Sequence, residues 1–538
     1  MKQFLLALSL LVYSFSSQAQ YSRADSLRGS LSEFRMFDVF YYDLNIKIDP
    51  FQKSISGYND IHFTTEDTIN KLQLDLFENM QVDSISYNGL KLAYQREFDA
   101  VWLFFEPFLP PGSHIISFYY KGKPTIAEKP PWDGGFVWKT DSAGLPWVTV
   151  ACEGAGASLW WPNKDHLSDE PDSMRITGIV PEKLMCVANG VLEKIGNPEP
   201  GFQSYQWKIS YPINNYNVTL NIANYTHLHD YYLTKDNDTL NLDYYVLPIN
   251  KEKAAGHFMQ VKDMLRCFEQ YFGPYPFIID GYKLVETPYW GMEHQSAIAY
   301  GNKYVNNEFG FDFIIVHESG HEYWGNSIST WDHGQMWVHE SFTTYMESLL
   351  VECQQGYKQS IAYLKTQKPL IKNEMAIEQP IGVNFTGWND ADMYYKGTWM
   401  LHTIRNIIDD DQKWFDILRR LYNNYKLSIV NSEDIINFID KEATHDLLPV
   451  FQQYLHEINP PVLQYYWKKA NGDYKLFFRW HQVVEGFAMP IKFHSKGQTH
   501  TITPTNDWQS GKLKSKKNFE WATDLFYVIP EMVNEETH

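Results

Sequence analysis

His317, Glu318 and His321 of the segment HESGHEYWGN (317–326), together with the later Glu340, have the types and spacing of a zinc site. Residues four apart share one face of a helix, so His317 and His321 can both direct a ring nitrogen at one metal ion, with Glu318 beside them. Eighteen residues separate His321 from Glu340, which allows a return helix to supply a third ligand. Three protein ligands leave one coordination position open, as in catalytic zinc sites. The pattern predicts one zinc ion per chain.

The chemistry expected of this site is hydrolysis assisted by a carboxylate. Glu318 follows His317 directly and is placed to take a proton from an attacking water and pass it to a leaving amine. Glu347 lies two turns after Glu340 on the same face of its helix, where it either orients a histidine ligand or is an ordinary surface glutamate. The alternative for the whole motif is an exposed helix with two ordinary histidines. The apolar residues around it favour a buried helix.

Composition limits the class of protein and its partners. The formal charge of −19 argues against nucleic acid as a partner and against stable binding to an anionic membrane. Four cysteines in 538 residues cannot be the main source of stability, although one disulfide remains open, with no pair singled out. The 16% of aromatic residues could form sugar-binding surfaces or, more simply, pack in strands and a wide core.

The first twenty residues, MKQFLLALSLLVYSFSSQAQ, have the form of a secretory signal peptide, with cleavage expected after Ala19 or Gln20. The apolar run is short for a membrane span, and no second stretch of spanning length follows. The sequence therefore predicts an exported, periplasmic or extracellular protein with no stable membrane insertion.

The pattern of apolar and polar residues along the chain predicts three domains after residue 20. Short alternating runs separated by Asn-Gly and Pro-Pro-Gly turns indicate an antiparallel β domain over 21–240. Helical periods dominate 241–458, including a motif helix over about 311–325. Alternation returns over 459–538, which predicts a small C-terminal β-sandwich-like domain.

Four segments together, HESGHEYWGN, WVHESFTTYMESLL, WGMEHQSAIAYGN and DMYYKGTWML, resemble the gluzincin aminopeptidase family that contains aminopeptidase N and leukotriene hydrolase. The pattern runs through about residues 35–530. The resemblance implies that the helical region is a thermolysin-like catalytic domain. The expected fold class is multidomain α+β, with β domains on either side of a mainly helical catalytic domain.

The resemblance also implies how the substrate would be held. The family's Gly-x-Met-Glu-Asn loop looks like Trp290-Gly291-Met292-Glu293-His294, so Gly291 and Met292 would contact substrate and Glu293 would bind its free ammonium group. Trp290 and His294 depart from the family pattern at the first and last positions. A third departure is His339, where the family usually has Asn before its ligand glutamate.

Two further roles follow from the same resemblance. The family's Tyr-x-Lys-Gly looks like Tyr394-Tyr395-Lys396-Gly397, which makes Tyr394 the phenol that hydrogen-bonds the oxyanion, while Tyr395 is expected to face elsewhere. Glu153, in VACEGA, is the best match to an upstream group that also contacts the substrate N-terminus.

The expected function is a zinc-dependent aminopeptidase acting on peptides with a free N-terminus. The alternatives are a thermolysin-like endopeptidase, favoured if the changes at Trp290 and His294 destroy ammonium recognition, and a non-enzymatic peptide-binding protein that retains a zinc site. A carbohydrate-binding module built on the aromatic-rich strands is a weaker option.

Overall fold

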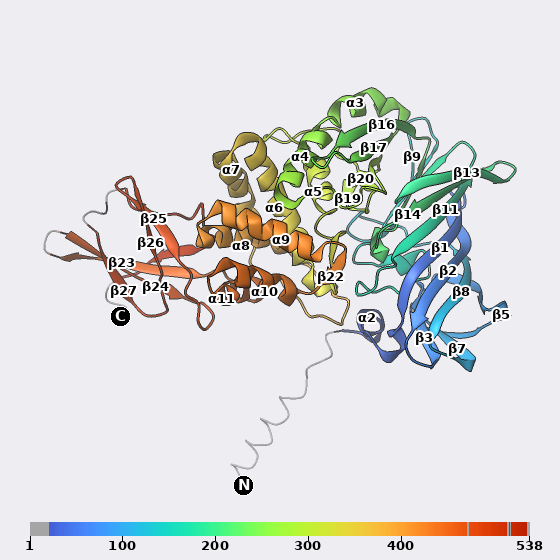
Figure 1. The fold of residues 1–538 in the computed structure, drawn as a ribbon, viewed down its shortest axis with the longest axis horizontal. Helices are drawn as coiled ribbons and strands as arrows, with labels where there is room; N and C mark the ends of the chain where they lie inside the picture. The colour runs from blue at the N-terminus through green and yellow to red at the C-terminus, as the bar shows by residue number, and fades with distance from the viewer. Residues whose placement is uncertain (1–20, 471–472, 514–515, 517, 535–538) are drawn as a thin grey trace, which may run out of the picture.

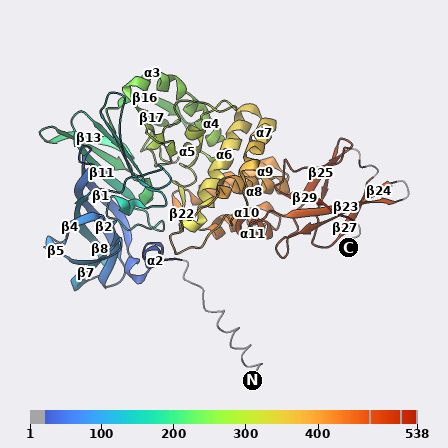
Figure 2. The same ribbon diagram turned by 180° about the vertical axis from the view of Figure 1, so that it is seen from behind.

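The computed structural model describes residues 21–470, 473–513, 516 and 518–534. The predicted signal peptide lies outside these described residues. Within them, a helical region lies between an N-terminal β region and a small β region at the opposite end (Figure 1). The view from behind shows the same three-part arrangement (Figure 2). No helix of the described residues is long and apolar enough to cross a membrane.

The N-terminal region is built from three sheets that follow a short helix, α2 (Arg23–Gly29). Their strand orders are β13-β14-β11-β1-β2-β8-β4-β5, β12-β15-β10-β9 and β3-β7-β6. Pairing is antiparallel except between β1 and β11, which run parallel. The strands are β1 (Asp38–Asp49), β2 (Ser54–Thr65), β3 (Ile69–Asp75), β4 (Met80–Tyr87), β5 (Leu90–Lys91), β6 (Ala93–Glu97), β7 (Ala100–Leu109), β8 (Gly112–Gly122), β9 (Gly135–Thr140), β10 (Pro146–Ala151), β11 (Ser173–Pro181), β12 (Met185–Ala188), β13 (Val191–Glu199), β14 (Phe202–Ile209) and β15 (Leu220–Ala223).

A five-stranded sheet in the order β16-β17-β18-β20-β19 connects this region to the helices. The strands are β16 (Thr226–Leu233), β17 (Thr239–Val246), β18 (Tyr282–Glu286), β19 (Gly291–Met292) and β20 (Ile298–Tyr300). Strand β17 crosses the expected domain boundary at residue 240 and pairs in parallel with β18. The hairpin of β16 and β17 therefore extends the sheet whose edge strand β19 carries the Gly-Met of the substrate-binding motif.

The helical region has nine described α-helices after this hairpin and one short parallel pair, β21 (Ile328–Thr330) with β22 (Ser428–Val430). The motif helix is shorter than expected, because the helix ends at Gly320 and His321 begins a series of turns. The helices are α3 (Lys251–His257), α4 (Gln260–Phe272), α5 (Phe313–Gly320), α6 (Trp337–Gln355), α7 (Tyr357–Gln367), α8 (Asp392–Ile408), α9 (Asp411–Tyr425), α10 (Ser432–Ala443) and α11 (Leu448–His456).

Two glycines allow α5 and α8 to approach α6 closely. A Cβ on Gly320 would lie 3.0 Å from Cγ2 of Thr343, and one on Gly397 would lie 1.8 Å from Oγ of Ser341. A side chain at either position would push the helices apart. Close packing on α6 therefore brings the motif helix, Glu340 and the Tyr394 segment of α8 to one place.

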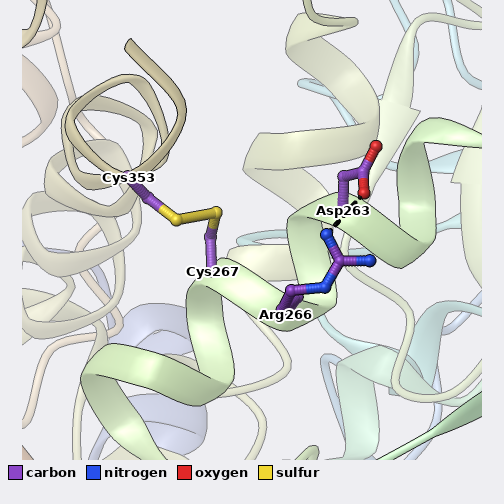
Figure 3. The surroundings of a disulfide bond; sticks show 4 residues. All are labelled: Asp263, Arg266, Cys267 and Cys353. Carbon is purple, nitrogen blue, oxygen red and sulfur yellow. Dashed lines mark hydrogen bonds and ion pairs between the residues drawn. A yellow bond between two sulfur atoms is a disulfide. The ribbon is translucent and has the colours of Figure 1, made fainter. Parts of the chain in front are cut away.

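A disulfide between Cys267 and Cys353 joins α4 to α6, the helix that carries Glu340 (Figure 3). Beside Cys267 on α4, Arg266 forms an ion pair with Asp263. The other two cysteines, Cys152 and Cys186, are buried thiols. The structure thus assigns the one disulfide that the sequence left open.

The C-terminal region contains two small open sheets, in the orders β27-β24-β23-β29 and β26-β25-β28. Buried aromatic side chains such as Phe478, Phe493 and Trp521 pack its interior, and Tyr527 joins it to α11 by accepting a hydrogen bond from Tyr454 at its backbone oxygen. The strands are β23 (Val462–Ala470), β24 (Asp473–His481), β25 (Ile491–Ser495), β26 (Gln498–Ile502), β27 (Gln509–Leu513), β28 (Glu520–Trp521) and β29 (Ile529–Met532).

Candidate active site

The three predicted metal ligands converge at the junction of α5 and α6. His317 lies on α5, His321 directly follows it, and Glu340 is in the first turn of α6. The Nε2 atoms of His317 and His321 are 3.3 Å apart. Oε2 of Glu340 lies 3.5 Å from Nε2 of His317 and 3.4 Å from Nε2 of His321. All three side chains are buried.

Hydrogen bonds on the far side of each ring define which nitrogen faces this centre. Nδ1 of His317 lies 2.7 Å from Oε1 of Glu347, and Nδ1 of His321 lies 2.9 Å from the backbone oxygen of Trp324. Both Nδ1 atoms face acceptors and must donate, so each neutral ring presents the lone pair of its Nε2 atom to Oε2 of Glu340. This carboxylate oxygen is buried and has no hydrogen-bond partner. Three acceptors that face one another need a cation between them, and two imidazoles with a carboxylate suit zinc.

Glu347 connects this centre to α7. Its Oε2 accepts a hydrogen bond from the hydroxyl of Tyr363 at 2.5 Å and one from Gln367 at 3.2 Å, while Oε1 faces His317. Glu347 is therefore not a surface glutamate. It is buried, and its carboxylate contacts Nδ1 of His317. Such partners fix the ring orientation of a metal ligand and raise its basicity.

We expect Glu347→Gln to weaken zinc binding by about 10- to 100-fold, because an amide orients His317 less strongly than a carboxylate does. Competition with a chromophoric chelator measures this affinity. Glu352→Gln, on the same helix but paired with Arg405, is the matched control and should leave the affinity unchanged. Equal affinities for the Glu347 variant and the wild type would contradict this role.

Glu318 lies beside the histidines and under the backbone of β19. Burial, opposed by the neighbouring His317 and His321, raises the pKa of Glu318 to about 7. A Cβ on Gly291 would lie 2.5 Å from Oε1 of Glu318. The glycine before Met292 therefore leaves room for this carboxylate to face the cleft.

Two more carboxylates lie beyond the metal ligands. Oε1 of Glu293 accepts a hydrogen bond from the hydroxyl of Tyr216 at 3.0 Å, and its backbone oxygen accepts one from Asn326. Burial, together with the nearby Glu293, raises the pKa of Glu153 well above its ordinary value, and burial also raises the pKa of Glu293. Two close carboxylates without a cation favour a positively charged ligand between them.

Tyr394 completes the site from α8. Its ring stacks on His317 with 5.9 Å between ring centroids. Burial and the nearby Glu340 raise the pKa of Tyr394 well above its ordinary value, so the phenol keeps its proton and can donate a hydrogen bond. Tyr395, which was expected to face elsewhere, also lines the cleft, because in the first turn of α8 its ring lies beside that of Tyr394, with 6.3 Å between ring centroids.

The departures from the family pattern leave the ligand set in place. His339 is buried and its Nε2 accepts a hydrogen bond from the backbone N–H of Thr330 at 3.0 Å. His294 is fully buried, and burial lowers its pKa to about 3, so it is a neutral core residue. Trp290 differs from both because it lies at the cleft surface.

All nine residues predicted for the site line one cleft of about 670 Å³ between the N-terminal and helical regions. Tyr216 was not predicted, since it lies in a short 3-10 helix, Asn215–Asn217, with no sequence motif to mark it. The lining residues are Pro131, Trp132, Asp133, Glu153, Gly154, Ala155, Trp290, Gly291, Met292, Glu293, Phe313, Ile314, His317, Glu318, His321, His333, Met336, Glu340, Thr344, Glu347, Phe385, Thr386, Trp388, Asp390, Ala391, Met393, Tyr394 and Tyr395.

A second group of His227, His229 and Asp243 lies on the hairpin of β16 and β17. Both histidines face the same oxygen of Asp243, at 2.7 and 3.1 Å, which are hydrogen-bond distances. These shorter contacts and the exposure of both rings distinguish this group from the buried centre, so we assign no metal to it.

The fold and the ligand set define a gluzincin-type centre, in which a His-Glu-x-x-His segment and a glutamate of the next helix hold one metal ion. Residues 257–454 match the family model described as "Peptidase family M1 domain". This match over the region of the metal ligands supports the resemblance to the gluzincin aminopeptidase family that the motifs indicated.

Curated relatives have low sequence identity to the chain. Aminopeptidase B of Rattus norvegicus is 21% identical over 194 residues, which cover 33% of this chain and 30% of that protein. The probable aminopeptidase 1 of Saccharolobus solfataricus is 20% identical over 437 residues, or 76% of this chain and 52% of that protein. The matches therefore span about half or less of these relatives.

Solved structures confirm the expected fold class. Aminopeptidase A of Legionella pneumophila, in complex with aspartic acid, has a TM-score of 0.77 at 17% identity and covers 93% of this chain and 60% of its own. The M1 zinc metallopeptidase of Deinococcus radiodurans has a TM-score of 0.67 at 19% identity, over 79% of this chain and 94% of its own.

Proposed function

We propose that this protein is a zinc-dependent aminopeptidase that removes the N-terminal residue from peptides. The observation that carries the proposal is the arrangement of one buried His-His-Glu centre with Glu318 beside it and two further carboxylates, Glu293 and Glu153, in the same cleft. The relatives named as aminopeptidases support it, and a Deinococcus radiodurans M1 peptidase has been solved bound to the peptide Tyr-Ser-Ala.

Recognition of the substrate N-terminus falls to Glu293 and Glu153. A free α-ammonium group placed between them relieves their mutual repulsion and replaces the water lost on burial. An acylated N-terminus, or a peptide bond in mid-chain, offers no cation and leaves the carboxylates unpaired. This arrangement favours aminopeptidase over endopeptidase action.

Zinc held by His317, His321 and Glu340 would supply Lewis-acid polarisation of the scissile carbonyl and acidify a water molecule. Glu318, as a carboxylate, accepts the proton of the attacking water and delivers it to the leaving amine. The hydroxyl of Tyr394 donates a hydrogen bond to the oxyanion that forms as the carbonyl becomes tetrahedral. A binding protein without catalysis would need neither Glu318 nor Tyr394 at these positions.

We also propose that the protein acts outside the cytoplasm. The signal-like segment and the disulfide between Cys267 and Cys353 support this, because disulfides persist in oxidising compartments. Cell fractionation with mass spectrometry should find a mature N-terminus at Gln20 or Tyr21. Recovery of the full-length chain in the cytoplasm would contradict export.

A panel of fluorogenic aminoacyl substrates tests the activity. We expect hydrolysis of at least one substrate, loss of hydrolysis after treatment with a chelator, and recovery after one equivalent of zinc is added back. Hydrolysis that survives complete removal of zinc would overturn the proposal.

A further inference from the structure

A row of aromatic rings extends from the metal centre to the mouth of the cleft. Phe313 stacks on His317 with 5.3 Å between ring centroids, and Trp290 stacks on Phe313 at 5.4 Å. Trp132, from a loop of the N-terminal region, lies 6.4 Å from Trp290. All of these rings line the cleft.

The two tryptophans are unusually exposed for their size. Trp290 is 44% exposed and Trp132 is 71% exposed. Nε1 of Trp290 donates to Oδ1 of Asn302 at 3.0 Å, and Asp133, next to Trp132, accepts hydrogen bonds from two backbone N–H groups of its own loop. Large apolar rings left uncovered in a cleft are typical of a surface that a ligand covers.

The position of the row along the cleft follows from α5 and β19. Glu293, which would bind the ammonium group, groups with Glu318 and with His321 at the C-terminal end of α5. Phe313 is the first residue of α5, one turn before His317, and Trp290 precedes Gly291 on the strand that ends near Glu293. The metal ligands and Glu318 therefore lie between the ammonium site and the aromatic row.

A bound peptide must extend from the ammonium site, past the metal ligands, towards the aromatic row. With its ammonium group at Glu293 and its first carbonyl at the metal centre, the next residue lies on the far side of Glu318, against Trp290 and Trp132. Among the described residues that line the cleft there is no lysine or arginine, and Asp133 already accepts two backbone hydrogen bonds. The surface offered to the second residue is aromatic.

We propose that Trp132 and Trp290 form the binding surface for the second residue of the substrate and select peptides with an aromatic or large aliphatic side chain there. The proposal rests on the proposed aminopeptidase function and specifies its substrate class. Trp290 stands where the resembling family has glycine, so this surface belongs to this chain and is not implied by the family pattern.

The test compares two tripeptides that differ only at the second residue, Ala-Phe-Gly and Ala-Gly-Gly, with release of free alanine measured by mass spectrometry. The zinc-loaded wild type should show a kcat/KM about ten-fold higher for Ala-Phe-Gly, the effect of burying one ring against an aromatic pair. Trp290→Gly and Trp132→Ala should each bring this ratio close to one, chiefly by lowering kcat/KM for Ala-Phe-Gly.

Trp331→Ala is the matched control, because Trp331 is also partly exposed but does not line the cleft. It should keep the wild-type ratio. Thermal melting and zinc content verify that each variant is folded, and Trp132, on an exposed loop, serves if Trp290→Gly does not fold.

Three results would overturn the inference. They are efficient hydrolysis of both tripeptides with a wild-type ratio near one, a preference that survives in both tryptophan variants, and a preference for lysine over phenylalanine at the second position. Failure to hydrolyse either tripeptide or any substrate of the aminoacyl panel would instead overturn the proposed function itself.

Discussion

Glu318→Gln should lower kcat by roughly 100- to 10,000-fold, since general acid–base catalysis by a single group contributes about this much. The amide is nearly isosteric with the carboxylate and fits beneath Gly291, but it cannot accept a proton from water. The three predicted metal ligands are unchanged, so zinc should remain bound. Steady-state kinetics on an aminoacyl substrate and metal analysis of the same sample provide the measurement.

The test is decisive because activity and zinc content are both measured on the same sample. A variant that lost zinc together with activity would show a structural effect and leave the role of Glu318 untested, so Glu318→Asp provides a second measurement. It keeps a carboxylate but moves it by one methylene, and we expect partial activity with full zinc content. Residual turnover of the Gln variant within ten-fold of wild type would exclude Glu318 as the base.

Glu293→Gln should lower kcat/KM for peptides with a free N-terminus by about 30- to 150-fold. This corresponds to a loss of about 2 to 3 kcal/mol of binding free energy in the transition state. The variant keeps an acceptor for the hydroxyl of Tyr216 and removes the charge that pairs with the ammonium group. Kinetics on one peptide and its N-acetylated form measure the effect, because discrimination between the two should fall in the variant.

Glu269→Gln is a matched control for this change. Glu269 is also a buried glutamate that accepts a hydrogen bond from a tyrosine, Tyr232, but it lies outside the cleft. The control should retain wild-type kcat/KM and discrimination. An equal loss in both variants would show that destabilisation accounts for the effect, and no loss at Glu293 would remove it from substrate recognition.

The metal centre could be predicted from the sequence because its geometry is local. His317 and His321 are one helical turn apart, and a return helix that carries Glu340 needs only a short connection. The end of α5 was less predictable, since the chain changes from helix to turns at His321 within an apolar segment that gives no stop signal. Local spacing thus indicated the ligands more reliably than the length of the helix that holds them.

Long-range features gave no comparable signal. The pairing of β17 with β18 across residue 240, the bond from Tyr216 to Glu293 and the pairing of Cys267 with Cys353 all join segments far apart in the chain. The aromatic row likewise joins Trp132 of the N-terminal region to Trp290 of the catalytic sheet. Individual motifs therefore predicted some of the residues that line the cleft. The shape of the cleft could not be predicted in this way, because it depends on packing between regions.

The most direct test of the account uses one unmodified hexapeptide and its N-acetylated twin, incubated separately with the zinc-loaded protein and followed by mass spectrometry. We expect stepwise loss of single residues from the N-terminus of the free peptide, no cleavage of the acetylated twin, and no cleavage of either after chelation. Internal cleavage of the acetylated twin at a comparable rate would contradict it and would identify an endopeptidase.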